Sequence, residues 1–397
     1  MRVLWHSTVP WGGTSYSVLT KRTVPELLKL GHDVTISTWW GLQGAPQKVS
    51  WVEDGRTYQA TVLPSMHAAS YGQDVLPAAV KMIRPDVVIT CMDVWVLPPS
   101  LTGLFPYFAP WLPIDHDPAP EPVVKALETA KKPLVYSKWG KRVLAESGVE
   151  AMYVPCSAPS HIYRPLDKAD CKKKLGIDPG RFVIGMVAAN KGYPSRKCFP
   201  EQLLAFARFR ANHPDAMMYI HTLRTPEHGG IDFDALLKRV GLDDGSVMFA
   251  DQYRYILGYP EPAMADLYRA FDFLSLTSMG EGFGIPLIEA QACGTPVVTS
   301  DNTAMTELCF SGRLVTEQYP FWTPLGAWAM IPDYRAVADA YEQMYDDLHD
   351  PERELQLTQA ARLGALDYAW DTVVSQFWQP LLERVEADIE RSRVSDL

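Results

Sequence analysis

The sequence predicts an α/β fold with two doubly wound, parallel-sheet domains. The chain has 397 residues, and because one hydrophobic core rarely grows past about 250–300 residues, two domains are expected. Short apolar segments alternate with segments of helical spacing almost throughout, which is typical of parallel sheets covered by helices. The alternation pauses at residues 155–167, a Pro- and Ser-rich stretch without periodicity that predicts the interdomain linker. We expect an N-terminal domain over residues 1–160, a C-terminal domain over 161–370, and a final helix over 371–397 that packs back on the first domain.

The first half opens with the strand RVLWHST, followed by a Gly-Gly turn. Residues 15–31 have helical spacing, and Pro25 should kink this helix or split it. Gly31 stands where a C-terminal cap belongs, and HDVTISTW follows as the second strand. The other elements expected here are helices at 74–83 and 138–148 and strands at 85–92, 106–115, 133–137 and 151–156.

The second half repeats the strand–helix alternation, which is the reason for expecting a second doubly wound sheet. The tail, residues 370–393, has the spacing of one long amphipathic helix that contains Pro380. The strands expected in this half lie at 182–190, 216–223, 246–251, 272–278 and 296–300, and the helices at 200–213, 232–242, 264–271, after Gly284 and at 334–350.

The composition excludes several classes of protein. The net charge is −10, whereas a nucleic-acid-binding domain usually has a basic face, so no nucleic-acid partner is expected. The six cysteines include no C-x-x-C pair, which favours a reduced cytosolic chain over a disulfide scaffold or a zinc site. The N-terminal apolar run is too short for a signal peptide, and no stretch approaches the roughly 20 apolar residues of a membrane span. We therefore expect a cytoplasmic protein.

The stretch EGFGIPLIEA, residues 281–290, places two glutamates around a Gly-Phe-Gly turn that leads into an apolar helix. Pro286 suits the first helical position and Gly294 the end, so Glu289 is expected in the first turn and Glu281 in the preceding loop. A helix N-terminus carries about +0.5 elementary charge, and glycines let the backbone approach a ligand closely. Carboxylates accept hydrogen bonds from sugar hydroxyls, so this element predicts a site for a ligand with hydroxyls and an anionic part. The alternative is that Glu289 only complements the helix dipole.

The longer block SMGEGFGIPLIEAQACGTPVV resembles the signature of the family-4 retaining glycosyltransferases, which have the GT-B fold of two Rossmann-like domains facing each other across a cleft. The glutamate spacing, the Gly-Phe-Gly turn and the G-T-P-V-V run all match. The resemblance extends in order along nearly the full chain, mostly as pattern rather than identity. It implies that Glu289 binds the ribose of a nucleotide and that Glu281 lies by the donor sugar. The backbone amides around Gly282, Phe283 and Gly284 would then face the donor sugar and phosphate.

A basic loop after the first strand of the second half resembles the family's Arg/Lys loop, which binds the diphosphate. In ANKGYPSRKCFPEQLLAF, Lys197 matches the usual lysine and Arg196 precedes it. The family often has an earlier arginine just after the strand. Here Asn190 stands near that place with Lys191 beside it, which leaves open which second cation holds the phosphates. From the residues alone, a solvated basic loop is the alternative.

The N-terminal domain carries the remaining candidates. LPIDHDP resembles the family segment whose histidine ends a strand and reaches the donor sugar, which implies a catalytic role for His116. Asp115 and Asp117 flank this histidine and could orient it or meet the acceptor. Gly12 and Gly13 resemble the glycine-rich loop that lies close to the donor diphosphate and sugar.

The resemblance implies transfer of a sugar from a nucleotide sugar with retention at the anomeric carbon. Arg196, Lys197 and the loop amides would stabilise the departing nucleoside diphosphate. The family favours front-face attack, in which the leaving phosphate oxygen takes the acceptor's proton and Glu281 positions the donor. A covalent carboxylate nucleophile is the alternative. The sequence offers no D-x-D pair in a suitable loop, so we expect neither a required divalent metal nor a tightly bound cofactor, and the nucleotide sugar serves as co-substrate.

Other functions predict other features. A nicotinamide dehydrogenase predicts G-x-G-x-x-G after the first strand and an acid after the second, and both are missing here. A non-catalytic two-domain module that binds a nucleotide or sugar would not need cations aimed at a leaving group. A sugar epimerase or a phosphorylase of the same architecture also remains open, although the glutamate motif favours transfer.

The acceptor is not defined by the sequence, and a saccharide, a lipid-linked group, a protein and a small molecule all remain open. The loops at 64–74 and 91–100 are candidate walls of its site, with His67, Asp93 and Trp95 as lining residues. The segment 125–142 is locally basic, and we expect a solvated helix face there rather than contact with a membrane surface.

Overall fold

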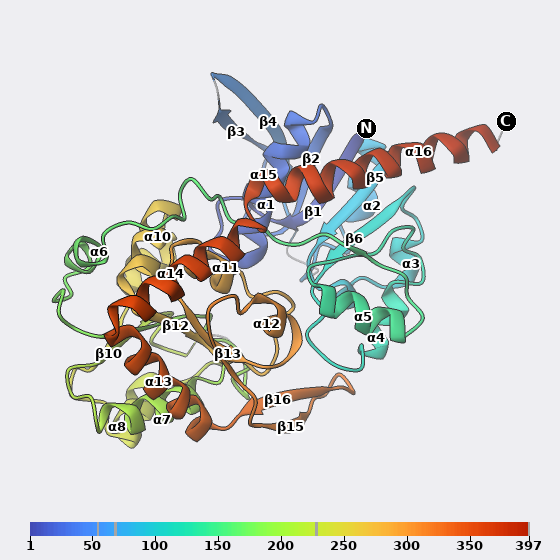
Figure 1. Cartoon of the computed structure of the whole chain (residues 1–397). Helices are drawn as coiled ribbons and strands as arrows, with labels where there is room; N and C mark the ends of the chain where they lie inside the picture. The colour runs from blue at the N-terminus through green and yellow to red at the C-terminus, as the bar shows by residue number, and fades with distance from the viewer. Residues whose placement is uncertain (54, 67–69, 227–228, 396–397) are drawn as a thin grey trace. The chain divides into compact units, whose positions relative to one another are not determined.

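The chain folds into two units, each built around its own parallel sheet (Figure 1). The first unit comprises Met1–Ser157, the short segment Pro324–Ala327 and the C-terminal segment from Asp371. The second comprises Ala158–Thr323 and Trp328–Trp370. No helix within the described residues is both long and apolar enough to cross a membrane. The computed structural model describes residues 1–53, 55–66, 70–226 and 229–395.

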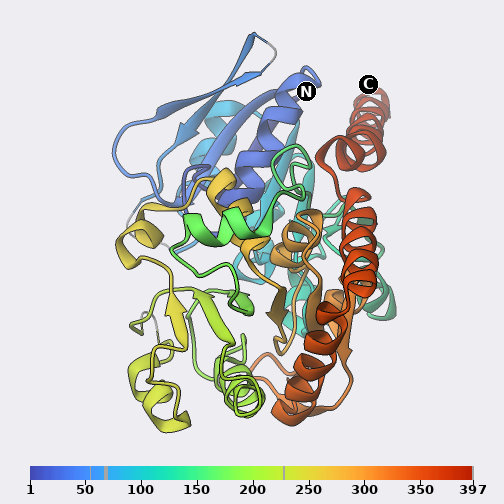
Figure 2. The same ribbon diagram turned by 60° about the vertical axis from the view of Figure 1, so that its left-hand side comes forward.

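The sheet of the first unit has the strand order β3-β4-β2-β1-β5-β6-β7-β8 (the blue and cyan arrows of Figure 2). All neighbouring strands pair in parallel except β3 and β4, which form an antiparallel hairpin at the edge. From β1 the chain passes to β2, then to the edge strand β3 and back to β4 between them, and it returns to β5 on the other side of β1. This reversal makes the carboxyl ends of β1 and β5 a topological switch point, where ligands bind in open α/β sheets. The strands are β1 Arg2–Thr8, β2 Asp33–Trp40, β3 Gln47–Glu53, β4 Arg56–Leu63, β5 Val87–Cys91, β6 Phe108–Leu112, β7 Leu134–Val135 and β8 Met152–Tyr153.

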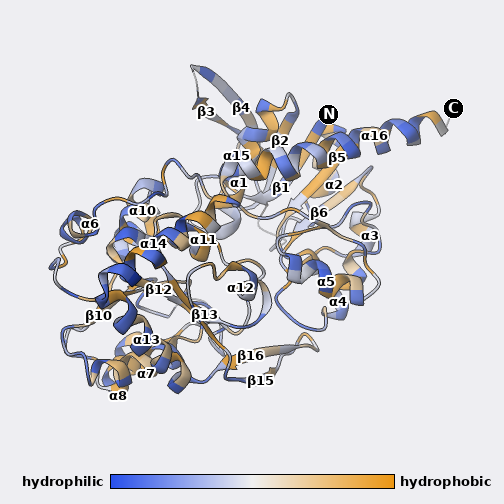
Figure 3. Cartoon of the chain, in the orientation of Figure 1, coloured by the Kyte–Doolittle hydropathy of each residue, from blue (hydrophilic) through white to orange (hydrophobic). Residues whose placement is uncertain are grey.

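Apolar side chains hold this unit together. The central strands read as continuous apolar runs, and Figure 3 shows the hydrophobic colour along β5. The indole ring of Trp378, from the C-terminal segment, packs against Trp5 and Trp111, with ring centroids 6.0 Å and 5.0 Å apart. The helices are α1 Ser15–Lys29, α2 Leu76–Ile83, α3 Pro99–Thr102, α4 Glu121–Ala126, α5 Lys138–Glu146, α15 Trp370–Val373 and α16 Gln379–Ser395, with short turns η1 Val94–Val96 and η2 Val374–Trp378.

The sheet of the second unit has the order β11-β10-β9-β12-β13-β14, and all of its strands are parallel. This is the doubly wound Rossmann order, and its switch point lies between β9 and β12. A separate antiparallel hairpin, β15 with β16, follows the last strand. The strands are β9 Val183–Val187, β10 Met217–His221, β11 Val247–Phe249, β12 Phe273–Leu276, β13 Val297–Ser300, β14 Gly312–Val315, β15 Gln318–Trp322 and β16 Trp328–Pro332.

Helices cover this second sheet, and their buried faces are rich in aromatic residues. Phe199, Phe206 and Phe209 of α7 and Phe233 of α8 are completely buried. The helices are α6 Lys168–Lys174, α7 Phe199–Arg210, α8 Phe233–Val240, α9 Gln252–Leu257, α10 Glu261–Ala270, α11 Ile285–Ala292, α12 Thr303–Leu308, α13 Tyr334–His349 and α14 Pro351–Leu366.

The structure confirms the predicted fold class of doubly wound parallel sheets, with two local corrections. Pro25 does not split the first helix, because α1 runs through it. The helix buries residues on both sides of this proline, and that packing outweighs a cost of about 3 kcal/mol for an interior proline. The tail is not one continuous α-helix, since the π-helical turn η2 interrupts it directly before α16. Pro380 is the second residue of α16 and has no N–H to donate back into the preceding turn.

Candidate functional site

The strongest candidate site lies at the switch point of the second sheet. The loop after β9 carries Arg196 and Lys197, and the loop after β12 carries Glu281. The two loops are joined directly, because Met279 N donates a hydrogen bond to Arg196 O at 2.8 Å. The structure therefore brings together three residues that the sequence analysis had assigned to one site.

The carboxylate of Glu281 is the centre of this cluster. Lys197 Nζ donates to its Oε1, and Arg196 Nη1 lies 3.5 Å from its Oε2 and donates to Gly280 O. Burial alone would raise the pKa of Glu281, but the charges of Lys197 and Arg196 outweigh burial and hold that pKa below its ordinary value. Glu281 is therefore an ionised carboxylate at neutral pH. Its side chain is only 8% exposed, whereas that of Arg196 is 44% exposed and can reach a ligand.

The loop that carries Glu281 is fixed by the backbone around it. Glu281 N donates to Thr303 Oγ1 at 2.9 Å, which ties the loop to the start of α12. Gly284 has φ +105°, and a Cβ at this position would also lie 3.0 Å from a Leu287 methyl group, so both conformation and space favour glycine. The Phe283 ring is buried and lies 5.7 Å from the Tyr368 ring. Loop and helix are thus preorganised.

Glu289 occupies a different position on α11 from the one expected. Since α11 begins at Ile285, Pro286 is its second residue and Glu289 lies in the second turn, not the first. The Glu289 side chain is buried, and its Oε2 accepts a hydrogen bond of 2.8 Å from the hydroxyl of Tyr268 on α10. Simple complementation of the helix dipole does not account for a buried carboxylate that is held by a second helix.

Several buried polar atoms at this end of the sheet have no hydrogen-bond partner among the described residues. They are Ser195 Oγ after β9, His221 Nδ1 at the end of β10, Thr222 Oγ1 after it, Thr277 Oγ1 after β12 and Ser300 Oγ at the end of β13. Buried polar groups are normally hydrogen-bonded. All five belong to the carboxyl ends of neighbouring strands or to the loops that follow, where α/β proteins bind ligands. The sequence analysis missed them, although their position directly after apolar strands is a readable signal.

The side chain of Asn190, in the loop after β9, forms hydrogen bonds to the backbone of neighbouring loops. Its amide nitrogen donates to Leu223 O at 3.1 Å and Ile231 O at 2.8 Å, and its oxygen accepts from Ile231 N at 2.7 Å. Both amide hydrogens are therefore used to hold the neighbouring loops. The contacts of Asn190 account for its burial without a phosphate.

In the first unit, the two glycines after β1 differ in their surroundings. A Cβ at Gly12 would lie 2.4 Å from Ser17 Oγ, so packing against α1 favours glycine there. A Cβ at Gly13 would meet nothing within 4 Å. Packing therefore does not explain Gly13, and close approach of a ligand remains a reason for a glycine at this position.

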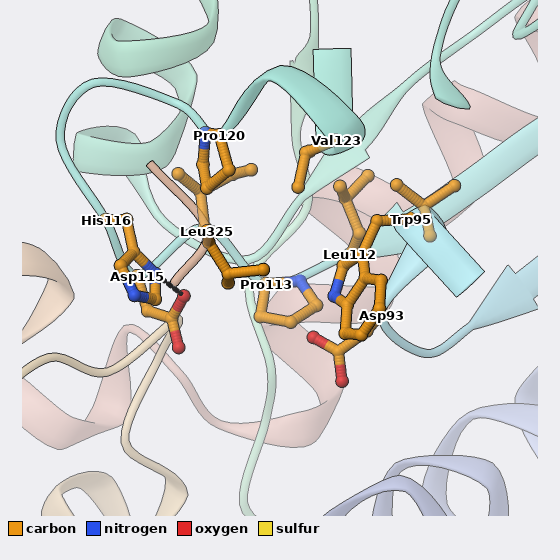
Figure 4. Close-up of a pocket in the computed structure, with 11 residues that line it drawn as sticks. Asp93, Trp95, Leu112, Pro113, Asp115, His116, Pro120, Val123 and Leu325 are labelled. Atoms are coloured by element: carbon orange, nitrogen blue, oxygen red, sulfur yellow. Dashed lines mark hydrogen bonds and ion pairs between the residues drawn. The ribbon is translucent and has the colours of Figure 1, made fainter. Parts of the chain in front are cut away.

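His116 lines a small pocket at the carboxyl ends of β5 and β6, together with Asp93, Trp95 and Asp115 (Figure 4). Its Nδ1 lies 2.7 Å from Asp115 Oδ1, and Figure 4 shows these two side chains facing each other, with Asp93 and Trp95 on the other side of the pocket. The contact with Asp115 occupies Nδ1, so the other ring nitrogen, Nε2, is the one that can meet a ligand. The other residues that line the pocket are Val94, Leu112, Pro113, Ile114, Pro120, Val123 and Leu325.

Other acidic neighbours of this pocket have their own partners. Asp93 accepts a hydrogen bond of 2.8 Å from the hydroxyl of Tyr16 on α1, which fixes its carboxylate. Asp117 lies 3.3 Å from Arg142, so of the two acids that flank His116, Asp115 is the one that orients the ring. His67, the third predicted lining residue, lies outside the described residues. Among those that are described, no group of three or more His, Cys, Asp or Glu side chains has a metal-binding arrangement.

Part of the chain is similar to known glycosyltransferases. Residues 202–347 match the model of the family described as Glycosyl transferases group 1. A D-inositol 3-phosphate glycosyltransferase of Rhodococcus jostii is 32% identical over 141 residues, which cover 35% of this chain and 29% of that protein. The lipopolysaccharide core biosynthesis mannosyltransferase LpsB of Rhizobium meliloti is 29% identical over 217 residues, 52% of this chain and 55% of that protein. The chain thus spans about half or less of the length of these curated relatives.

Solved structures confirm the fold. Sucrose-phosphate synthase from Thermosynechococcus elongatus superposes with a TM-score of 0.75 at 16% identity, covering 98% of this chain and 100% of that one. HepE from Anabaena, solved in complex with UDP-glucose, superposes with a TM-score of 0.68 at 15% identity, covering 96% and 100%. The GT-B fold expected from the sequence is therefore confirmed, as is the resemblance to glycosyltransferases.

Proposed function

Because the chain carries a Glycosyl transferases group 1 domain over residues 202–347, we propose that it is a retaining glycosyltransferase that uses a nucleotide diphosphate sugar. The observation that carries the proposal is the convergence of Arg196 and Lys197 on the buried, ionised Glu281 at a Rossmann switch point. Two cations beside one carboxylate leave an excess of positive charge, which suits a diphosphate. The UDP-glucose bound by HepE, a protein with the same fold, makes a nucleotide sugar the first ligand to test.

In the proposed donor complex, Arg196 and Lys197 hold the diphosphate. Glu281 accepts hydrogen bonds from donor sugar hydroxyls, Glu289 accepts them from the ribose, and the amides of Gly282, Phe283 and Gly284 line the loop. Gly13 lets the backbone after β1 come close to the donor. Asn190 shapes the loop that presents the two cations instead of binding the phosphates itself.

In the proposed reaction, the bond between the anomeric carbon and the diphosphate oxygen breaks, and a bond to the acceptor oxygen forms on the same face. The acceptor's proton passes to the departing phosphate oxygen. Arg196 and Lys197 stabilise the charge that develops on the leaving group, and preorganised cations of this kind are the largest single source of stabilisation in many enzymes. They supply this charge without a divalent ion, so we propose metal-independent transfer.

The surroundings of Glu281 favour a positioning role over a covalent one. Its two carboxylate oxygens face Lys197 and Arg196 respectively, and this pairing lowers the nucleophilicity of both oxygens. In the first unit, His116 has Nε2 available for the donor sugar because Asp115 engages Nδ1. Asp93 and Trp95 line the same pocket and are proposed to meet the acceptor.

The decisive experiment combines binding and turnover. Thermal shift is measured with UDP, GDP, ADP and inorganic pyrophosphate, and release of the diphosphate is then followed with the corresponding nucleotide glucoses and mannoses. We expect stabilisation by one nucleotide and slow release of diphosphate from its sugar, to water or to an added acceptor. Nucleotide binding without turnover on any donor would favour a non-catalytic binding module, and no binding at all would contradict the proposal.

A further inference from the structure

The β15–β16 hairpin presents two different faces. In an antiparallel pair, directly opposed residues lie on the same side of the sheet. Phe321 is opposite Ala329, and Trp322 is opposite Trp328, so the two pairs lie on opposite faces. We call the face that carries Phe321 and Ala329 the inner face, because it packs against the rest of the second unit, and the face that carries Trp322 and Trp328 the outer face.

The inner face rests on the loops of the proposed donor site. Phe321 packs with the buried cluster of Cys198, Met279 and Ala329. Met330 N also donates a hydrogen bond of 3.0 Å to Met279 O. Cys198 directly follows Lys197, and Met279 stands two residues before Glu281. The hairpin is therefore anchored to both loops that carry the charged cluster.

The outer face is open. Trp322 is 56% exposed and Trp328 is 46% exposed, and their ring centroids are 4.8 Å apart at an interplanar angle of 68°. The tilt leaves a corner bounded by two indole surfaces. Tryptophan is usually well buried, and a contiguous exposed aromatic surface on a soluble domain commonly marks a binding site.

The charge around this corner indicates what binds there. Residues 316–333 include Glu317 and Asp333 but no lysine or arginine, and the nearby Arg335 lies 3.8 Å from Asp333, whose charge it offsets. An anionic lipid surface or a nucleic acid would find no cluster of positive charge on this segment, and both need one. An uncharged ring with an apolar face suits the two indole surfaces better than an anionic ligand does. The C–H faces of a pyranose are apolar and its hydroxyls lie at the edge, so it can stack on indole while its hydroxyls stay in water.

We propose that Trp322 and Trp328 form a stacking platform for a pyranose ring of the acceptor, which makes the acceptor a saccharide or a glycoconjugate that ends in one. This proposal rests on the proposed transferase function, because it assigns the acceptor of that same reaction. Two aromatic surfaces fixed to the donor loops would orient an acceptor sugar next to the transfer site. The acceptor is thus recognised in part by the second unit.

Saturation-transfer difference NMR with maltose, lactose and methyl α-mannopyranoside tests the platform directly. We expect transfer to the ring C–H protons of at least one probe with the wild type, and about a three- to tenfold loss of affinity for that probe in Trp322→Ala and Trp328→Ala. Trp322→Tyr should retain most of the signal. Tyr319→Ala is the matched control, because Tyr319 is also 56% exposed on this hairpin but lies on the other face.

The outcomes separate this proposal from the proposed function. Absence of signal for all three probes, or full signal in both alanine variants, overturns the platform. A lower melting temperature that accompanies the loss of signal also overturns it, because the pair would then be holding the hairpin. Binding to phosphatidylcholine–phosphatidylglycerol vesicles that requires both tryptophans would assign the surface to a membrane instead. UDP and GDP binding, measured on the same samples, reports on the donor site alone and tests the proposed function independently.

Discussion

The ammonium group of Lys197 donates a hydrogen bond to a carboxylate oxygen of Glu281, a residue 84 positions later in the sequence. Each follows a strand that borders the switch point of the second sheet, β9 for Lys197 and β12 for Glu281. In the protein without a ligand, the two side chains form an ion pair and neutralise each other's charge. A diphosphate would compete with Glu281 for the same ammonium group, so donor binding and the state of this carboxylate are coupled.

Removing the ammonium group should weaken nucleotide binding. For Lys197→Ala we expect about a 10- to 150-fold higher Kd for the nucleoside diphosphate, because a hydrogen bond to a charged group contributes about 1.5–3 kcal/mol. Isothermal titration calorimetry with the diphosphate measures this change. Lys191→Ala is the matched control, since Lys191 is an exposed lysine of the same loop. Equal losses in both variants would show that the loop acts only through its net charge.

Neutralising Glu281 should separate binding from turnover. Glu281→Gln removes the negative charge that faces Arg196 and Lys197, so the diphosphate should bind as well as or better than to the wild type. Turnover should fall by about 100-fold or more, because the donor sugar loses a charged acceptor that positions it. Steady-state rates and diphosphate titrations together check this. A parallel loss of nucleotide affinity would place Glu281 in diphosphate binding instead.

The stability of the second unit should depend on the protonation of Glu281. Its pKa in the folded protein is lowered from the ordinary value of 4.5, so the unfolded state takes up this proton first as pH falls. The stabilisation is present above pH 4.5 and is lost as pH drops through the lower folded pKa. Urea unfolding of the wild type and Glu281→Gln at several pH values measures the difference. We expect the difference in unfolding free energy to shrink towards pH 3, and a constant difference would contradict the ion pair.

The two glycines after β1 should respond differently to alanine. Gly12→Ala should lower the free energy of unfolding by about 1–3 kcal/mol, because its Cβ would collide with Ser17 Oγ. Gly13→Ala should leave the unfolding free energy nearly unchanged and lower turnover, since only a ligand would meet the new methyl group. Melting curves and donor turnover, measured side by side, distinguish the two effects. Normal turnover in Gly13→Ala would remove this residue from the proposed donor site.

The sequence predicted the two sheets because parallel strands are buried on both faces and read as apolar runs. The resemblance to family-4 glycosyltransferases assigned Arg196, Lys197 and Glu281 to one donor site, and the structure brings the three side chains together. The β3–β4 and β15–β16 hairpins were missed. The residues of β3 are at least partly exposed, so this strand lacks the apolar run of a buried strand. β15 contains Pro320, and a proline inside a run argues against a strand.

Contacts that depend on tertiary packing could not be predicted from the sequence either. The hydroxyl that holds Glu289 comes from Tyr268 on another helix, and nothing local indicates the pair. The role of Asn190 was read from its position after β9, but its hydrogen bonds go to loops more than 30 residues away. Retention at the anomeric carbon and membership of family 4 remain predictions. The sequence makes no prediction of the donor base.

The hydrogen bond from Met330 N to Met279 O also makes the hairpin a reporter of the loop that ends in Glu281. This amide can exchange with deuterated solvent only when the hairpin lifts from the loop. Its protection therefore measures how often the loop is released from its support. A donor that rigidifies the loop should slow this exchange.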